Sequence, residues 1–198
     1  MDIKKIREQE IIFLEENTKR VLSKVPAFIK NKEVRLLGQI TRAKLKPIKL
    51  LEKLYTFMDE TAEFISEYSP CHKGCSSCCN MDVSISDIEV EFIEVKEGIK
   101  REKRKSPPKN NFGAPCPFLI EGACSIYKSR PYVCRKYSTL ARSEFLCDIS
   151  IHGVDIRYST VHFNNVENSI NYIKNKSKSY KIYDIRQMFK RNKLETNI

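Results

Sequence analysis

The stretch Cys71-His72-Lys73-Gly74-Cys75-Ser76-Ser77-Cys78-Cys79 places four cysteines within nine residues, and the rest of the chain is organised around it. The other cysteines all follow it along the chain, at Cys116, Cys124, Cys134 and Cys147. In a reducing compartment, cysteines gathered in this way more often hold a metal than form a disulfide framework. The pattern therefore predicts a metal-dependent module over residues 70–150.

All eight thiols are candidate metal ligands, namely Cys71, Cys75, Cys78, Cys79, Cys116, Cys124, Cys134 and Cys147. The competing interpretation is a buried apolar stripe, because a free cysteine packs like a small hydrophobe. Gly74, Ser76 and Ser77 are poor neighbours for such a stripe. Adjacent cysteines seldom both reach one tetrahedral ion. We therefore expect one of Cys78 and Cys79 to serve another site, a polynuclear cluster or packing.

The chain around the first cysteines favours a short helical turn. Ser69-Pro70 ends the preceding helical stretch, and serine followed by proline also suits an N-cap and a first helical position. A helix rotates by about 100° per residue, which would place the four clustered cysteines within roughly 100° of one another. We therefore expect these sulfurs to share one face, near a helix N-terminus that favours thiolates.

Ligands that are all cysteine suit zinc or iron-sulfur chemistry and disfavour magnesium, calcium or manganese. Two closed zinc sites would use all eight sulfurs, whereas a [4Fe-4S] cluster would use four. The vicinal pair Cys78-Cys79 and the nearby Arg130 and Arg135, which could offset an anionic centre, favour iron-sulfur slightly, and the choice stays open. These arginines could equally be surface residues. His72, His152 and His162 are weaker candidate ligands.

Periodicity predicts an α+β fold that is predominantly α-helical, with a small cysteine-rich metal-binding module packed against N- and C-terminal helices. Residues 1–69 should form a helical region, with helices over residues 3–24, 32–44 and from Pro47 towards Tyr68. Residues 151–198 should form a C-terminal helical region, with one helix from about 166 to 191. The chain of 198 residues suits one small domain with such neighbours.

Within the module, residues 81–85 alternate like a short strand, and Ser86 to Glu89 form a capping box before a helix that ends near Ile99. Glu89, Glu91 and Glu94 are expected on the solvated face of that helix. A hairpin turning at residues 121–122 should bring Cys116 and Cys124 to its base. Residues 100–115 are expected to form a basic loop. We favour a flexible linker, and the alternative is a loop that contacts phosphates.

The first residues are charged and lead to no apolar h-region, and no apolar run is long enough to span a bilayer. We therefore expect a cytoplasmic protein without a signal peptide or a membrane contact. The formal net charge of +11 would fall by about 4 if eight thiolates held two zinc ions. A basic surface is compatible with nucleic acid or an acidic protein as partner, although a solvated lysine-rich surface explains the charge as well.

The order of these motifs resembles a known family. The quoted stretch, then residues 116–119, Gly122, residues 124–127, Arg130-Pro131 and Cys134-Arg135, is similar to the YkgJ-type cysteine-cluster proteins, also called the CxxCxxCC family of zinc- or iron-chelating domains. The resemblance covers about residues 70 to 147, and the first spacing here is three residues rather than two. It implies metal binding without a settled general activity.

A related branch, the flagellin lysine methylase, resembles the chain in its cysteines and is associated with an iron-sulfur cluster. The chain is short for that enzyme and shows no S-adenosylmethionine site outside the cysteines, so the resemblance does not carry that activity over. The C-x3-C-x2-C spacing also occurs in radical S-adenosylmethionine enzymes, but these need a long strand-helix barrel after the motif. The sequence does not decide whether the protein is an enzyme.

Two functions follow as expectations. The favoured one is metal binding, in which the metal organises the fold and could support redox or methyl-transfer chemistry. The alternative is a non-enzymatic module in which structural zinc shapes a basic surface for nucleic acid or protein.

Overall fold

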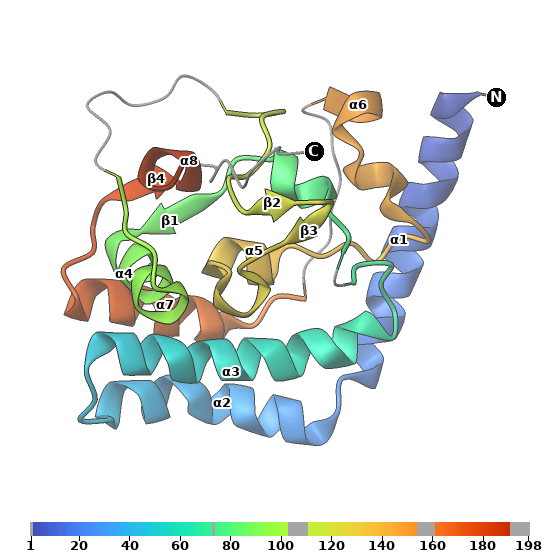
Figure 1. Cartoon of the computed structure of the whole chain (residues 1–198). Helices are drawn as coiled ribbons and strands as arrows, with labels where there is room; N and C mark the ends of the chain where they lie inside the picture. Colours follow the sequence, from blue (N-terminus) through green and yellow to red (C-terminus); the bar gives the residue numbers. More distant parts are fainter. Residues whose placement is uncertain (1, 73, 103–110, 154–160, 191–198) are drawn as a thin grey trace.

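A layer of helices forms the base of the molecule in the structure, a computed structural model that describes residues 2–72, 74–102, 111–153 and 161–190. The base consists of α2 (Ala27–Arg42), α3 (Pro47–Ser66) and α7 (Asn164–Lys176), which pack on one another. Helix α1 (Ile3–Lys24) lies along one side of the molecule (Figure 1). The helices predicted over residues 3–24 and from Pro47 are confirmed. Helix α2 begins earlier than predicted, directly after Pro26.

The apolar face of α3 holds this base together. Its buried side chains include Leu50, Leu51, Leu54, Tyr55, Phe57 and Met58. They share one apolar cluster with Ile29 and Ile40 of α2 and with Ile170 and Ile173 of α7. Because each large apolar side chain contributes about 1.5–3 kcal/mol when it is fully buried, this cluster anchors the helices. Among the described residues, no helix is both long and apolar enough to cross a membrane.

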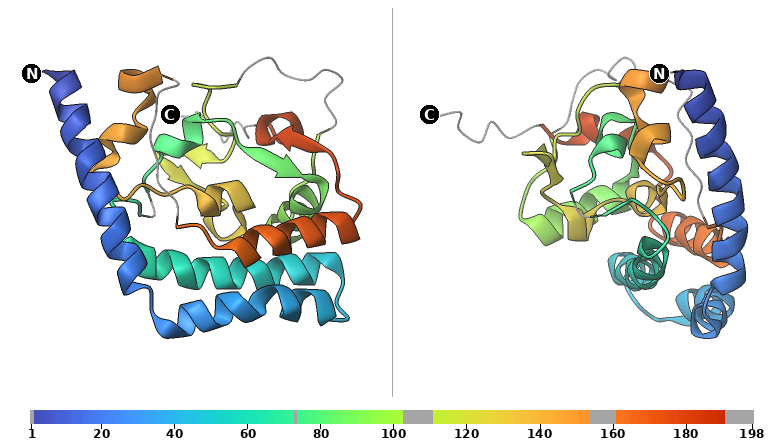
Figure 2. Two further views of the ribbon diagram at one scale, coloured as in Figure 1. Left: turned by 180° about the vertical axis from the view of Figure 1, so that it is seen from behind. Right: turned by 90° about the vertical axis from the view of Figure 1, so that its right-hand side faces the viewer.

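The cysteine-bearing segments lie on the other side of α3 from α2, as Figure 2 shows from two further directions. They comprise short elements: η1 (Ser77–Asn80), β1 (Ser84–Ser86), α4 (Asp87–Glu97), β2 (Leu119–Ile120), β3 (Ala123–Cys124), η2 (Tyr127–Ser129), α5 (Tyr132–Lys136), η3 (Glu144–Cys147) and α6 (Ile149–His152). Strand β4 (Ile182–Asp184) and α8 (Ile185–Met188) complete this side. Two small sheets and many helices confirm the α+β, predominantly helical class.

The predicted hairpin is present. Strands β2 and β3 pair antiparallel, with Leu119 opposite Cys124. The two residues of the turn, Glu121 and Gly122, both have positive φ angles, of 49° and 75°. Such a two-residue turn matches the right-handed twist of the paired strands. Cys124 therefore lies at the base of the hairpin, and Cys116 precedes β2 in the chain.

The prediction that one short helix carries Cys71, Cys75, Cys78 and Cys79 is wrong. Gly74 has a φ of 107°, which interrupts any helix between Cys71 and Cys75. Within the described part of this segment, the helical residues are those of η1, which is a 3-10 helix of four residues. The four sulfurs therefore do not share one helical face.

The prediction that the C-terminal helix reaches residue 191 is also wrong, because α7 ends at Lys176. Lys178 has a φ of 56°, and the chain turns there into β4. Strand β4 pairs antiparallel with β1, where Ser84 lies opposite Asp184. The strand predicted over residues 81–85 is thus present with shifted bounds. Tertiary pairing, which periodicity does not report, ends the helix early.

Part of the predicted basic loop and part of the predicted C-terminal helical region lie outside the described residues. The described flanks of the loop are attached to the fold. Arg101 makes an ion pair with Glu94 at 2.7 Å, and the backbone N–H of Gly113 donates to the carbonyl of Asn80 at 2.8 Å. These flanks are therefore anchored on both sides of residues 103–110.

Glu89 is buried, contrary to the expectation that it lies on a solvated face. Its side chain is 2% exposed. One carboxylate oxygen accepts from the N–H and the hydroxyl of Ser86, and this capping box confirms the predicted helix start. The other oxygen accepts from the Tyr55 hydroxyl at 3.0 Å and from the Tyr132 N–H at 2.8 Å. Glu89 therefore joins α3, α4 and α5 in one buried network.

Replacing this carboxylate tests the network. Glu89→Gln turns one acceptor oxygen into a donor that faces other donors, so we expect the free energy of unfolding to fall by about 2 kcal/mol. Chemical denaturation measures the change. Glu91→Gln on the exposed side of α4 is the matched control and should be near neutral. Equal effects of the two substitutions would contradict the network.

Candidate metal centre

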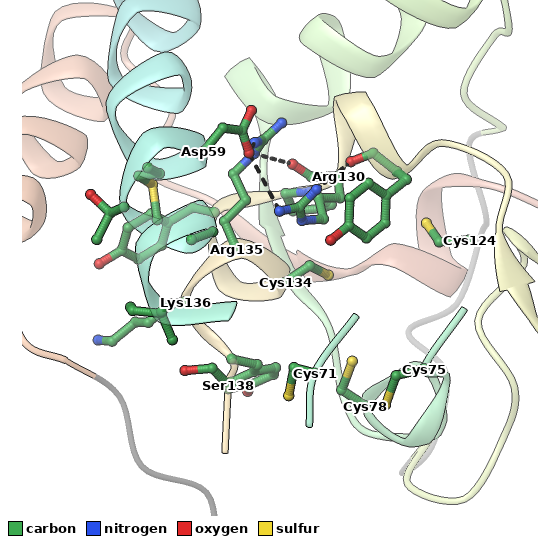
Figure 3. A pocket seen from close by; sticks show the side chains of 18 of the residues that line it. Asp59, Cys71, Cys75, Cys78, Cys124, Arg130, Cys134, Arg135, Lys136 and Ser138 are labelled. Carbon is green, nitrogen blue, oxygen red and sulfur yellow. Dashed lines mark hydrogen bonds and ion pairs between the residues drawn. The ribbon is translucent and has the colours of Figure 1, made fainter. Parts of the chain in front are cut away.

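The eight cysteines come from separate segments of the chain and lie around two neighbouring spaces. A cavity of about 720 Å³ is lined by seven of them, namely Cys71, Cys75, Cys78, Cys79, Cys116, Cys124 and Cys134. The eighth, Cys147, lines a second space of about 30 Å³ together with Cys71, Cys75 and Cys78. Figure 3 shows Cys71, Cys75 and Cys78 close together, with Cys134 and Cys124 farther along the cavity.

The thiols lie near one another, but they do not surround a common metal position. All eight are free cysteines. As they are placed, no three His, Cys, Asp or Glu side chains of the described residues form a group that could hold a metal ion. Metal sites seldom exist preformed in the metal-free chain, because ligand binding and local ordering are coupled. Binding would have to draw these sulfurs together by side-chain rotation and small backbone shifts.

Cys71 is the thiol best prepared to ionise. Its sulfur accepts the S–H of Cys75, which holds the pKa of Cys71 at about 7. The backbone N–H of Thr139 also donates to this sulfur at 3.4 Å. The same S–H contact raises the pKa of Cys75, because Cys75 is the donor. Such a pair, one thiolate and one thiol, is a suitable starting point for a metal that displaces the remaining proton.

The other side of the cavity is less favourable to thiolates. Burial raises the pKa of Cys116 to about 11 and that of Cys147 to about 11. Burial also raises the pKa of Cys134 well above its ordinary value. These thiols are protonated in the metal-free protein at neutral pH, so metal binding there must release protons.

The vicinal cysteines differ sharply from each other. The Cys79 S–H donates to the Cys78 sulfur, which lowers the pKa of Cys78 and raises that of Cys79. The backbone carbonyl of Cys79 accepts from the N–H of Cys116 at 2.7 Å, which ties η1 to the start of the hairpin segment. One member of the pair is thus prepared for ligation before the other.

Arg130 and Arg135 have different roles, although both were predicted to offset the charge of the centre. The positive charge of Arg130 favours the thiolate forms of Cys78, Cys124 and Cys134. Arg135 instead makes an ion pair with Asp59, which also contacts Arg130 (Figure 3). Its guanidinium lies 4.2 Å from the centre of the Tyr55 ring. Arg135 therefore fixes α5 against α3, and Arg130 is the arginine that faces the sulfurs.

Arg186 is a residue of this site that the sequence analysis missed. It is 6% exposed and donates to the carbonyls of Cys79 at 3.2 Å, Met81 at 3.0 Å and Ala114 at 2.5 Å. It also pairs with Asp184 at 3.0 Å, and its charge lowers the pKa of Cys116 against the larger effect of burial. Arg186 thus connects the backbone segments that carry Cys79 and Cys116.

Two of the three histidines have a polar partner at their Nδ1 atoms. The Nδ1 of His72 lies 2.7 Å from the carbonyl of Pro70, and the Nδ1 of His152 lies 3.0 Å from an Arg7 nitrogen. His162 lines the large cavity. His72 lines it too, but seven cysteines outnumber these two histidines, so the donor set is mainly sulfur. Thiolates fit zinc, iron or an iron-sulfur cluster. Such a group, when bound, would supply either a rigid cross-link or electron transfer.

Comparison with known proteins agrees with this donor set. Residues 70–149 match the family model CxxCxxCC, described as a "Putative zinc- or iron-chelating domain". The match confirms the resemblance inferred from the sequence and covers the same part of the chain as the cysteine motifs. Searches of curated proteins and of solved structures found no match to the chain.

Proposed function

We propose that residues 70–149 bind zinc or iron through the eight cysteines and that the bound metal holds this module together. The observation that carries the proposal is the convergence of the thiols: seven line one cavity, and Cys147 lines the adjoining space. The family match independently points to zinc or iron. Because the cysteines come from irregular chain and very short elements, a metal cross-link would contribute a large part of the local stability.

Within this proposal we favour iron-sulfur ligation over zinc, because of the electrostatics of the cavity. The positive charge of Arg130 favours the thiolate forms of Cys124 and Cys134, as the ligands of an anionic cluster would require. The cavity of about 720 Å³ has room for a polynuclear group. Zinc alone remains the alternative cofactor.

Elemental analysis and visible spectroscopy of protein purified without oxygen test the proposal. Iron with acid-labile sulfide and broad visible absorbance would support a cluster. Zinc without visible absorbance would support closed thiolate sites instead. Folded protein that contains neither metal would overturn the proposed function.

The large cavity supports a chemical role in addition to a structural one. Its volume falls within the range of about 300–1,000 Å³ that is common for small-molecule sites. Tyr127, Arg130 and Tyr132 line it beside the thiols. A small substrate could therefore bind next to the centre, as redox or methyl-transfer chemistry requires. Reversible bleaching of the visible absorbance by dithionite would support the redox form, and absorbance that dithionite leaves unchanged would contradict it.

The formal net charge of +11 favours a second candidate, a structural-zinc module that presents a basic surface to nucleic acid. Contacts to phosphates release counterions, so such binding weakens steeply with salt. This candidate would be supported if colourless, zinc-containing protein were retained on immobilised DNA or RNA and released as the salt concentration is raised. Absence of retention at low salt would remove it.

A further inference from the structure

We propose that the eight cysteines form two separate metal sites of four sulfurs each, an inference that rests on the proposed function. The first group is Cys71, Cys75, Cys78 and Cys147, and the second group is Cys79, Cys116, Cys124 and Cys134. The first holds a single divalent ion of the zinc type. The second holds a different centre that borders the large cavity.

The spaces between the side chains support the first group. Its four sulfur-bearing residues all line the space of about 30 Å³, together with neighbours such as Met81 and Thr139. One water-sized position occupies about 10–15 Å³, so this space corresponds to roughly two such positions. It is much smaller than the large cavity and suits one ion better than a polynuclear cluster. The size of the space therefore indicates a mononuclear site.

Packing supports the second group independently. Cys116 is a member of the apolar cluster formed by Val83, Ile85, Val90, Ile93, Phe118, Ile126, Ile185 and Phe189, and Cys79, Cys124 and Cys134 all pack against that cluster. All four also line the large cavity, as do Cys71, Cys75 and Cys78, so it is the apolar cluster that distinguishes the second group. These four side chains thus share one apolar wall, on the side of the module formed by β1, α4 and α8.

The conformation of η1 explains how adjacent cysteines reach different groups. A 3-10 helix has three residues per turn, so neighbouring side chains point about 120° apart. Cys78 and Cys79 both lie in η1, with the Cys79 N–H bonded to the carbonyl of Ser76 at 2.9 Å. Cys78 lines the small space while Cys79 packs against the apolar wall, although the Cys79 S–H donates to the Cys78 sulfur.

Cys147 brings a distant segment, η3, into the first group. Cys147 ends η3, which packs against η1 and also against α1. Leu146, the preceding residue, is fully buried in a cluster with Leu14 and Val21 of α1. The first site would therefore attach the cysteine stretch to the N-terminal helix, whereas the second would attach it to the hairpin and α5.

Cadmium-113 spectroscopy on the full-length protein tests the partition without substitutions. The protein is purified without oxygen, its metal is exchanged for ¹¹³Cd, and proton–cadmium correlations are recorded. We expect two cadmium resonances, one coupled to the β-protons of the first group and one to those of the second. A single four-cysteine site, or correlation of Cys79 with the ion that binds Cys71, would overturn the partition.

Native mass spectrometry of two variants provides a second readout. Cys147→Ser should lose one metal centre and keep the other, and Cys124→Ser should lose the other one. If the wild-type protein carries metal but either variant loses all of it while remaining folded, the partition is wrong and the proposed function stands. If the wild-type protein binds neither its native metal nor cadmium, both proposals are wrong.

Discussion

Cys134→Ser is expected to release metal and to lower the free energy of unfolding by about 4 kcal/mol or more. Cys134 lies on α5 and packs against the apolar cluster that also contains Cys116. Structural zinc contributes about 10–16 kcal/mol to the folding of small zinc modules, so the loss of one ligand removes a large share of this stabilisation. Metal content and denaturant unfolding, measured on the same oxygen-free preparation, check both parts of the expectation.

The same substitution in metal-free protein isolates the contribution of the metal. After chelation, Cys134→Ser exchanges one buried small side chain for another, and we expect a cost of about 1 kcal/mol. The difference between the two measurements gives the coupling between Cys134 and the metal. Ile126→Val, in the same apolar cluster, is the matched packing control and should keep full metal with a cost of about 1 kcal/mol. Equal costs with and without metal would show that Cys134 is not a ligand.

The features of the fold that local sequence controls were predictable. The apolar stripe of α3, the capping box at Ser86 and the turn at Gly122 each depend on residues close together in the chain, and all three are present. The family-type order of the cysteines likewise identified the module, because motif spacing is a local property. These predictions needed no knowledge of how distant segments pack.

The errors concern features that tertiary structure decides. Helical spacing suggested one face for the clustered sulfurs, but Gly74 adopts a positive φ that the sequence permits without requiring. Glu89 has the polarity of a surface residue, and its burial depends on donors from Tyr55 and Tyr132 on two other helices. The C-terminal helix stops because β4 pairs with β1. In each case a contact between distant segments outweighs the local preference.

The proposed grouping of the thiols depends even more strongly on contacts between distant segments. Cys78 and Cys79 are neighbours in sequence and in contact through their sulfurs, yet Cys78 lines the small space whereas Cys79 packs against the apolar cluster. Cys147 lines the same space as Cys71 and Cys75 because η3 packs against η1. No local sequence motif predicts this packing. Spacing can thus predict that cysteines act together, whereas the fold determines which of them would share an ion.

Arg186→Ala is expected to lower the free energy of unfolding by about 3–5 kcal/mol, because it leaves a largely buried Asp184 without its partner and several carbonyls without a donor. The affected carbonyls include those of Cys79 and Ala114, so the segments that carry the second group of cysteines should separate more easily. Chemical denaturation measures the first effect. Metal content after dialysis against a weak chelator measures the second.

Arg186→Lys separates the charge from the geometry of the guanidinium. Lysine keeps the pairing with Asp184 but cannot donate in a planar fork to carbonyls on several sides. We therefore expect an intermediate loss of stability, about 1–2 kcal/mol, with faster metal release than in the wild-type protein. Arg35→Ala on the exposed surface of α2 controls for the general loss of an arginine and should change neither quantity. An Arg186→Ala variant as stable as Arg35→Ala, with its metal retained, would show that the arginine does not hold the two segments together.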